Sequence, residues 1–434
     1  MIKYNYSVFL LRLYNIPNKL KTVVKGNNTL AIYEYTKGGK ISSIICGDVK
    51  TAYKYDLSGN RTDIRVSIGD ESLTHMSYKY DNRGNCILKS TSNEGIYDDV
   101  NVEYTYDGLD RLVGEKLTLG QNISTYSYAY DKAGNRKSLD IATSTVDRVG
   151  APSRKHVDYT YNSLNQLEKV NDINSPENIL NLIYDADGNL TSDGKGIYEY
   201  DALGHMSSAR LDEKNTLICR YDAEGLRYEV EENERLIKCI YKGRDVAVEE
   251  NDDGVTRYIR GNGRLIASDS EKARTYYHYV SDNIGSICYV INSGGKDADT
   301  NVSDGLSTLK ERIECHYEYD AFGNIVVSEE KIRNIFKFTG EQHDHLTNQY
   351  YLKARYYNPV IGRFTQTDTY LGDGLNLYAY VKNNPVKYVD PSGHCAENGM
   401  TGAGNVVDKG GKTTVPNPNG KKRWSSTSKY NKFD

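Results

Sequence analysis

The sequence predicts an all-β protein built from stacked β-hairpins. A Tyr-x-Tyr-Asp motif recurs at near-constant spacing, a Gly-Asn pair closes several of its copies, and no apolar pattern with the 3.6-residue helical period is sustained. Tyr supplies 39 of the 434 residues, against 6 Phe and 1 Trp. Because disordered chains are poor in aromatic residues, this composition indicates a folded chain. We expect few or no helices of more than three turns.

The repeat is clearest over residues 53–135, where the Asp of the motif recurs at Asp56, Asp81, Asp107 and Asp131, with spacings of 25, 26 and 24 residues. Further copies contain Tyr159, Tyr184, Tyr198, Tyr221 and Tyr317. In an extended strand the two Tyr rings stand on one face, since side chains alternate with period two. The Asp carboxylate then accepts hydrogen bonds from backbone N–H groups two residues on, and the Gly supplies a positive φ. Each unit is therefore predicted to be a hairpin of about two dozen residues.

A single hairpin cannot bury its aromatic face, so the units are expected to stack side by side. A dense Tyr stripe also suits a platform that binds carbohydrate. We favour structural stacking because every repeat carries the stripe, with hydroxyl groups that stay hydrated or paired.

Composition excludes several classes of protein. The 55 Lys and Arg against 59 Asp and Glu give a formal charge of −4, too balanced for a dedicated nucleic-acid binder. The seven Cys contain no Cys-x-x-Cys pair, which excludes zinc ribbons and redox motifs. The apolar run Val8–Leu11 is too short for a membrane span or a signal-peptide core. No metal or cofactor is predicted, because His343 and His345 have no third ligand nearby.

Changes in composition and motif content divide the chain into three regions. Residues 1–335 carry the repeats, with surface loops expected over 144–156 and 293–311. Residues 336–394 form a compact block dense in motifs. Residues 395–434 hold seven Lys or Arg against three acidic residues and show no periodicity, which predicts a loosely ordered tail.

The motifs of the block, with the repeats before it, identify a family resemblance. The block contains Phe338-Thr-Gly-Glu, Tyr350-Tyr-Leu-Lys-Ala-Arg-Tyr-Tyr-Asn-Pro, Gly362-Arg-Phe, Asn376-Leu-Tyr-Ala-Tyr-Val-Lys-Asn-Asn-Pro and Asp390-Pro-Ser-Gly. This series resembles the RHS-repeat-associated core domain, and the repeats resemble the YD repeats of the bacterial RHS family. Related proteins include wall-associated tRNA-nuclease toxins, toxin-complex C subunits and animal teneurins. The resemblance spans roughly residues 50–394.

The resemblance implies a spiralling β-shell, capped by the core domain, that encloses a polymorphic C-terminal toxin. It implies a secreted, cell-surface or cell-wall location. The implied partners are the chain's own C-terminal toxin segment or an upstream repeat polypeptide, together with an immunity protein or secretion machinery, and the shell itself binds no nucleic acid. The tail is then a truncated toxin stub or a linker.

The resemblance also implies a self-cleaving aspartyl protease that acts once. Its carboxylates would be Asp368 and Asp390, which lie 22 residues apart on either side of a predicted strand and turn over 378–384, with Arg363 in support. The cut would fall between His394 and Cys395. If the two carboxyl groups converge, their pKa values separate, and one acts as acid while the other activates water.

Two departures from the family pattern predict slow cleavage. Thr369 stands where the family has Pro, and His394 stands where it has Leu. From spacing alone, a turn-forming role is favoured over a catalytic one for Asp368 and Asp390, since Asp390 precedes Pro-Ser-Gly, and it is the family resemblance that favours a site.

Two other functions stay open on the sequence. The chain could be a structural or adhesive cell-surface repeat protein without catalysis. It could also carry an enzyme toxin in its tail, which we disfavour because that tail is about 40 residues long and lacks His and paired carboxylates.

Overall fold

The computed structural model describes residues 10–15, 19–25, 27–146, 151–175, 179–293 and 305–399. It confirms the all-β prediction, since α1 (Gly305–Arg312) is the one α-helix in these ranges. No helix within them is long and apolar enough to cross a membrane. Most of the predicted tail, residues 400–434, lies outside the described residues.

Two antiparallel sheets form the wall of the protein, and in both the strand order follows the chain. The first sheet contains β1 (Leu10–Asn15), β2 (Lys19–Lys25), β3 (Asn28–Tyr35), β4 (Ile41–Cys46), β5 (Val49–Tyr55), β6 (Arg61–Ile68), β7 (Glu71–Tyr80), β8 (Cys86–Ser92), β9 (Val100–Tyr106), β10 (Leu112–Leu119), β11 (Asn122–Tyr130), β12 (Arg136–Thr145), β13 (Ser153–Tyr161), β14 (Leu167–Asp172) and β15 (Leu180–Asn181). The second contains β16 (Ile183–Tyr184), β17 (Leu190–Ser192), β18 (Ile197–Tyr200), β19 (Met206–Arg210), β20 (Thr216–Tyr221), β21 (Arg227–Glu232), β22 (Arg235–Lys242), β23 (Asp245–Asn251), β24 (Gly254–Gly261), β25 (Arg264–Ser270), β26 (Thr275–Ser281), β27 (Ile287–Asn292), β28 (Ile313–Tyr319) and β29 (Ile325–Glu330).

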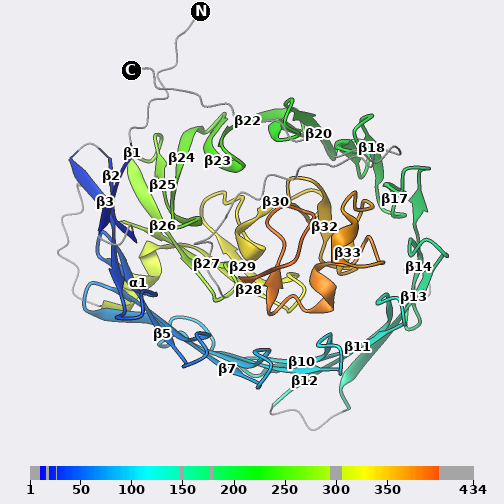
Figure 1. Ribbon diagram of the computed structural model, residues 1–434, viewed down its shortest axis with the longest axis horizontal. Helices are drawn as coiled ribbons and strands as arrows, with labels where there is room; N and C mark the ends of the chain where they lie inside the picture. Colours follow the sequence, from blue (N-terminus) through cyan, green and yellow to red (C-terminus); the bar gives the residue numbers. More distant parts are fainter. Residues whose placement is uncertain are drawn as a thin grey trace, which may run out of the picture.

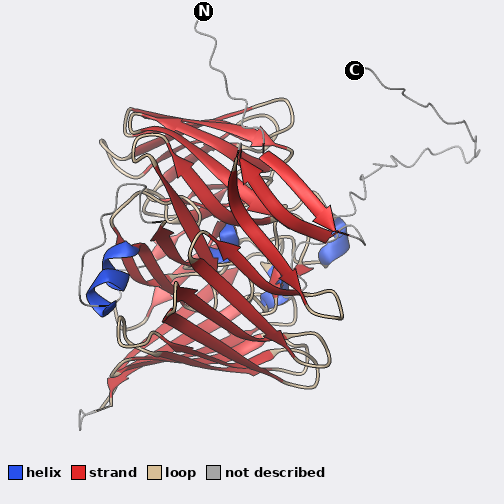
Figure 2. Cartoon of the chain, turned by 90° about the vertical axis from the view of Figure 1, so that its left-hand side faces the viewer, coloured by secondary structure: helices blue, strands red, loops and turns tan. Residues whose placement is uncertain are grey.

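The wall winds into a ring that closes on itself (Figure 1). Strands β1 to β3 lie against β24 and β25, where Leu20, Val23 and Tyr33 share a buried cluster with Ile259 and Ile266. Arg12 also donates to the backbone carbonyl of Arg260 at 3.0 Å. Figure 2 shows the wall strands side by side across the depth of the ring. The repeats thus bury their apolar faces by stacking and by ring closure.

Two predicted loops are shorter than the sequence indicated. Residues 144–145 belong to β12, where they pair with β11, and residues 153–156 belong to β13, which pairs with β12 from Ser153 onward. The end of the second loop, from Gly305, forms α1.

Many Tyr of the wall, most of them the second Tyr of a Tyr-x-Tyr motif, donate their hydroxyl to a backbone carbonyl, which Phe could not do. The hydroxyl of Tyr106 donates to the carbonyl of Cys86 at 2.6 Å, at a β-bulge where Cys86 pairs with Tyr80 in the preceding hairpin. The same bond recurs from Tyr55 to Ile41, Tyr80 to Arg61, Tyr130 to Leu112, Tyr161 to Arg136, Tyr200 to Leu190, Tyr221 to Met206, Tyr241 to Arg227 and Tyr319 to Ile287. Each hydroxyl satisfies a carbonyl group and links neighbouring hairpins.

Replacing Tyr106 with Phe is expected to lower the free energy of unfolding by about 1–3 kcal/mol, because the carbonyl of Cys86 loses its hydroxyl donor. Chemical denaturation of both proteins measures the difference. Tyr228→Phe is the control, since that side chain is 39% exposed. Equal losses in the two variants would contradict the structural role of the hydroxyl.

The turns follow the geometry that the sequence predicts. Asp81 Oδ1 accepts the backbone N–H groups of Arg83 and Asn85, both at 2.8 Å, and its Oδ2 accepts the side-chain amide of Asn85 at 3.0 Å. Gly84 has a φ of 76°, in the left-handed region that favours Gly. The side chain of Asn85 therefore holds the carboxylate of Asp81, the residue that begins the same turn.

Inside the ring lies the motif-dense block (Figure 1). It contains a small sheet of β30 (Gln342–Asp344), β31 (Gln349–Tyr351), β32 (Tyr356–Asn358) and β33 (Arg363–Phe364), the strand β34 (Tyr388–Val389), and the 3₁₀ turns η2 (Phe338–Gly340), η3 (Leu371–Asp373) and η4 (Val381–Asn383). Strand β34 forms a hairpin with β35 (Glu397–Asn398), which lies at the start of the predicted tail. Side chains of the block bind the glycine carbonyls of wall turns, from Asn383 to Gly134, Tyr378 to Gly188, Gln366 to Gly204, Tyr351 to Gly225 and Tyr350 to Gly323. Two hydrophobic clusters also contain residues of both the wall and the block. The wall and the block therefore share a core, and the domain boundary at residue 335 stays a prediction from the sequence.

A buried pair of acids joins two parts of the wall. Glu115 of β10 accepts the backbone N–H of Ala321 at 2.9 Å and the hydroxyl of Tyr128 at 3.2 Å. Burial, followed by the negative charge of Asp320, raises the pKa of Glu115 to about 8 from its ordinary 4.5.

This raised pKa predicts a pH-dependent stability. The folded protein keeps a proton on Glu115 that the unfolded chain loses above about pH 4.5, so this group makes stability fall as the pH rises from about 4.5 to about 8. Glu115→Gln is neutral at every pH, and we expect it to flatten the slope and raise the denaturation midpoint at pH 8. A slope that stays the same in this variant would rule out Glu115 as the cause.

Candidate functional site

The two predicted carboxylates converge on one arginine. Asp368 follows β33, and Asp390 follows β34; their exposed fractions are 7% and 3%. Arg355 Nη2 lies 2.7 Å from Asp368 Oδ2 and 3.8 Å from Asp390 Oδ2. Residues 378–384, predicted to be a strand and a turn, form an isolated bridge at Ala379 followed by the 3₁₀ turn η4.

Arg355, and not Arg363, is the guanidinium beside the dyad. Arg355 packs 3.6 Å from the centre of the Phe364 ring and donates to the carbonyls of Leu377, at 2.9 Å, and Gly393. Arg363 instead donates to the carbonyl of Asn165 at 2.6 Å and lies over two Tyr rings of the wall and the block. Both Arg belong to one run of motifs, and sequence spacing gave no signal to separate them.

Asp390 contacts the peptide bond that the sequence predicts to be cut. Its Oδ1 accepts the backbone N–H groups of Ser392 at 3.2 Å, Gly393 at 2.8 Å, His394 at 3.1 Å and Cys395 at 3.2 Å. The last of these is the nitrogen of the His394–Cys395 bond. The tight turn requires Gly393, since a Cβ there would lie 2.5 Å from the carbonyl oxygen of Leu352. Asp390 therefore forms the predicted turn and also accepts the N–H of Cys395, at the predicted cut.

A short hairpin holds this bond in place. In β34 and β35, Tyr388 pairs with Asn398 and Val389 pairs with Glu397. Residues 390–396 form the loop between them, which contains both Asp390 and the His394–Cys395 bond. The bond is thus fixed on both sides by backbone pairing.

The two acids have different surroundings. Burial is the main cause that raises the pKa of Asp390, opposed by the Arg355 charge and by donors from the turn. Asp368 has both oxygens engaged, since Oδ2 binds Arg355 while Oδ1 lies 2.9 Å from His394 Nδ1 and accepts the N–H of Tyr370 at 2.8 Å. The pKa of Asp390 is therefore raised above that of an ordinary Asp, whereas Asp368 is held by its ion pair with Arg355.

The pair His343 and His345 does not form a metal site in the described ranges, where no three His, Cys, Asp or Glu side chains are grouped to hold an ion. The intervening Asp344 forms a buried ion pair with Arg227 at 2.7 Å. Burial, with the nearby Lys337 charge, lowers the pKa of His343 to about 2.

Comparison with known proteins shows the family to which the chain belongs. A family model described as Teneurin YD-shell matches residues 50–386. The chain belongs to this family. The match confirms the identification of an RHS/YD-repeat protein. It ends before Asp390, so it does not include the predicted cut.

Two curated relatives of this YD shell are a nuclease and a toxin. The tRNA3(Ser)-specific nuclease WapA of Bacillus spizizenii is 34% identical over 303 residues, which is 67% of this chain and 12% of that protein. Double-stranded DNA deaminase toxin A of Burkholderia cenocepacia is 23% identical over 389 residues, which is 78% of this chain and 24% of that protein. The chain therefore spans a small part of the length of these relatives.

Among solved structures, the complex TcdB2-TccC3-Cdc42 aligns with a TM-score of 0.70 and 18% identity, over 89% of this chain and 20% of that one. The likeness shows that the two share the shell fold.

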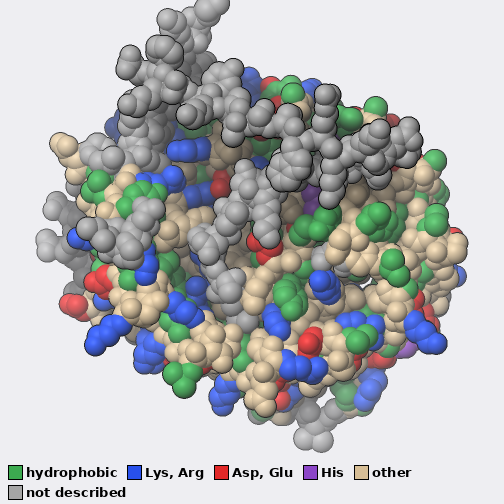
Figure 3. All heavy atoms as spheres, in the orientation of Figure 1, with side chains coloured by type: hydrophobic (Ala, Val, Ile, Leu, Met, Phe, Trp, Pro, Cys, Tyr) green, Lys and Arg blue, Asp and Glu red, His purple; other side chains and the backbone are tan. Residues whose placement is uncertain are grey.

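The surface of this YD shell has a mixed charge. Acidic and basic side chains both occur around the visible face (Figure 3), in keeping with the formal charge of −4.

Proposed function

We propose that this YD shell encloses the C-terminal segment of an RHS-type polymorphic toxin and frees it by one self-cleavage between His394 and Cys395. The observation that carries the proposal is the convergence of Asp368 and Asp390 on Arg355, with Asp390 Oδ1 at 3.2 Å from the nitrogen of Cys395. Its partners would be its own C-terminal toxin segment or an upstream repeat polypeptide, with an immunity protein and secretion machinery. Its place of action would be outside the cell, at the cell surface or in the wall.

The chemistry is hydrolysis of one amide bond. Asp368 accepts a proton from water, whose oxygen attacks the carbonyl carbon of His394. Asp390 carries its proton on Oδ2, because Oδ1 accepts the N–H of Cys395, and gives that proton to the nitrogen of Cys395 as the bond from carbon to nitrogen breaks. The products are a carboxyl group on His394 and an amine on Cys395. Because the substrate is part of the chain and is held in the loop between β34 and β35, proximity supplies much of the rate, and the reaction occurs once.

His394 gives a physical reason for a slow reaction. Its Nδ1 contacts Asp368 Oδ1 at 2.9 Å, while Arg355 holds Oδ2, so water must displace the imidazole to reach this carboxylate. This contact agrees with the sluggish cleavage that the sequence predicts for a His at this position.

The test is to purify wild type, Asp368→Asn and Asp390→Asn and to follow their intact masses. We expect the wild type to lose a fragment of residues 395–434, and both variants to stay whole. A wild-type chain that remains intact for days would leave the structural or adhesive function, in which Asp390 serves only its turn.

A further inference from the structure

Three consecutive turns of the wall contact the segments that carry the candidate dyad. They join β7 to β8, β9 to β10 and β11 to β12, and their Asp residues are Asp81, Asp107 and Asp131. The residues that they bind lie about 240 to 300 positions later in the chain. The first two turns bind the segment that leads to Asp390, and the third binds the segment that supports Asp368.

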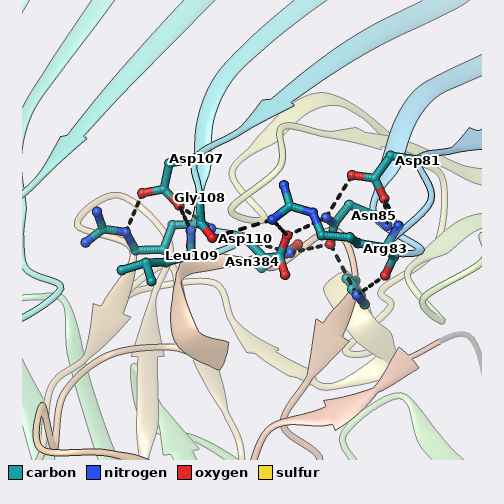
Figure 4. A network of polar contacts seen from close by, with 10 residues as sticks. Asp81, Arg83, Asn85, Asp107, Gly108, Leu109, Asp110 and Asn384 are labelled. Carbon is teal, nitrogen blue, oxygen red and sulfur yellow. Dashed lines mark hydrogen bonds and ion pairs between the residues drawn. The ribbon is translucent and has the colours of Figure 1, made fainter.

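Asn85 is the centre of the contact (Figure 4). It is fully buried, and its amide nitrogen donates to Asp81 Oδ2 at 3.0 Å and to Asp110 Oδ1 in the next turn at 2.8 Å. Its amide oxygen accepts from Asn384 Nδ2 and from Lys387 Nζ, both at 3.2 Å. One side chain thus joins two wall turns to the inner block.

Asn384 and Lys387 connect these wall turns to the hairpin that contains the predicted cut. Asn384 also donates to the carbonyl of Asp110 at 2.8 Å, and Lys387 to the carbonyl of Arg83 at 2.8 Å. The carbonyl of Lys387 accepts the N–H of Gly399 at 3.0 Å, directly beside the β34–β35 hairpin. Lys387 therefore anchors the base of the hairpin whose loop holds Asp390.

The third turn fixes the other carboxylate. Asn376 donates to Asn135 Oδ1 at 2.7 Å and to the carbonyl of Ala133 at 3.2 Å. The next residue, Leu377, has a carbonyl that accepts the N–H of Asp368 at 3.1 Å and Arg355 Nη1 at 2.9 Å. The backbone around Asp368 and Arg355 is thus held against the wall as well.

We propose that Asn85, Asn384 and Lys387 are positioning residues for the self-cleavage, and that they make it depend on closure of the wall around the inner block. This rests on the proposed function. The dyad reaches its geometry only when turns 81–85 and 107–111 are seated on the segment that leads to Asp390. A chain whose wall is not yet wound keeps its C-terminal segment attached.

The test compares Asn85→Ala with Asn60→Ala. Asn60 holds the same place one repeat earlier, and the hydrogen bonds of its amide that the structure describes stay within its own turn, on Asp56. Two quantities are measured at matched stability: the first-order rate of fragment release, and hydrogen exchange of the peptide 386–395. We expect Asn85→Ala to slow release by at least about tenfold and to raise exchange, whereas Asn60→Ala changes neither.

Variants of Lys387 keep the test informative if Asn85→Ala does not fold. Lys387→Met removes the hydrogen bonds of Nζ to the carbonyl of Arg83 and to Asn85 and should act as Asn85→Ala does, while Lys387→Arg keeps a donor and should restore most of the rate. Equal release and equal exchange in Asn85→Ala and Asn60→Ala would overturn the proposal. If the wild type never cuts, the proposed function fails, and exchange at 386–395 alone decides whether the wall turns hold this segment.

Discussion

Arg355→Met is expected to slow the release of the C-terminal fragment by about 100-fold or more, which is the scale seen when one preorganised donor is removed from an active site. The guanidinium contacts both carboxylates and the carbonyl of Gly393, next to the bond that is predicted to be cut. Without it, Asp368 loses the cation that binds its Oδ2, and the two carboxyl groups lose the side chain that they share. The rate is read from intact mass over time.

Arg363→Met is the matched control, because Arg363 is a buried arginine of the same run of motifs whose described contacts are with Asn165 and two Tyr rings. We expect it to lower stability while the folded protein still cuts. If Arg363→Met stopped cleavage of folded protein and Arg355→Met did not, the assignment of Arg355 to the dyad would be wrong.

The largest effect on stability is expected from Arg227→Met, which breaks a buried ion pair between the wall and the inner block. Arg227 Nη1 lies 2.7 Å from Asp344 Oδ2 and 2.7 Å from the hydroxyl of Tyr356, and the guanidinium carbon lies 4.4 Å from the centre of the Tyr351 ring. Removing one partner leaves a buried, uncompensated charge, at a cost of about 3–5 kcal/mol. Denaturant titration measures the loss.

A double variant separates the charge from the packing. Arg227→Met with Asp344→Leu removes both charges, so it should recover much of the stability that the single variant loses. A double variant as unstable as Arg227→Met would show that lost packing, and not the unpaired charge, causes the loss in the free energy of unfolding.

Local features of the fold were predictable from the sequence because they depend on near neighbours. The alternation of Tyr-x-Tyr, the Asp that caps its own turn and the Gly with positive φ all act within five residues, and the structure has each of them. The limits of the loops at 144–156 and 293–311 were wrong, since the pairing of β12 with β13 and the start of α1 leave no local turn signal.

The closure of the ring and the choice of Arg355 depend on contacts between distant residues. Lys387 meets Arg83 across 304 positions, and Arg355 meets Asp390 only once the block is folded within the wall. The contact from His394 to Asp368 was missed for the same reason. Asp368 and Asp390 themselves were found through the motifs of the family, and their catalytic role remains a prediction.

The most direct test of the self-cleavage is to identify the ends of the fragments released by the purified protein at neutral pH. We predict one new carboxyl end at His394 and one new amino end at residue 395, in the wild type and equally in Cys395→Ala, because water and not the thiol attacks the bond. A chain that stays whole, a cut at another bond, or a Cys395→Ala chain that no longer cuts would contradict hydrolysis by Asp368 and Asp390.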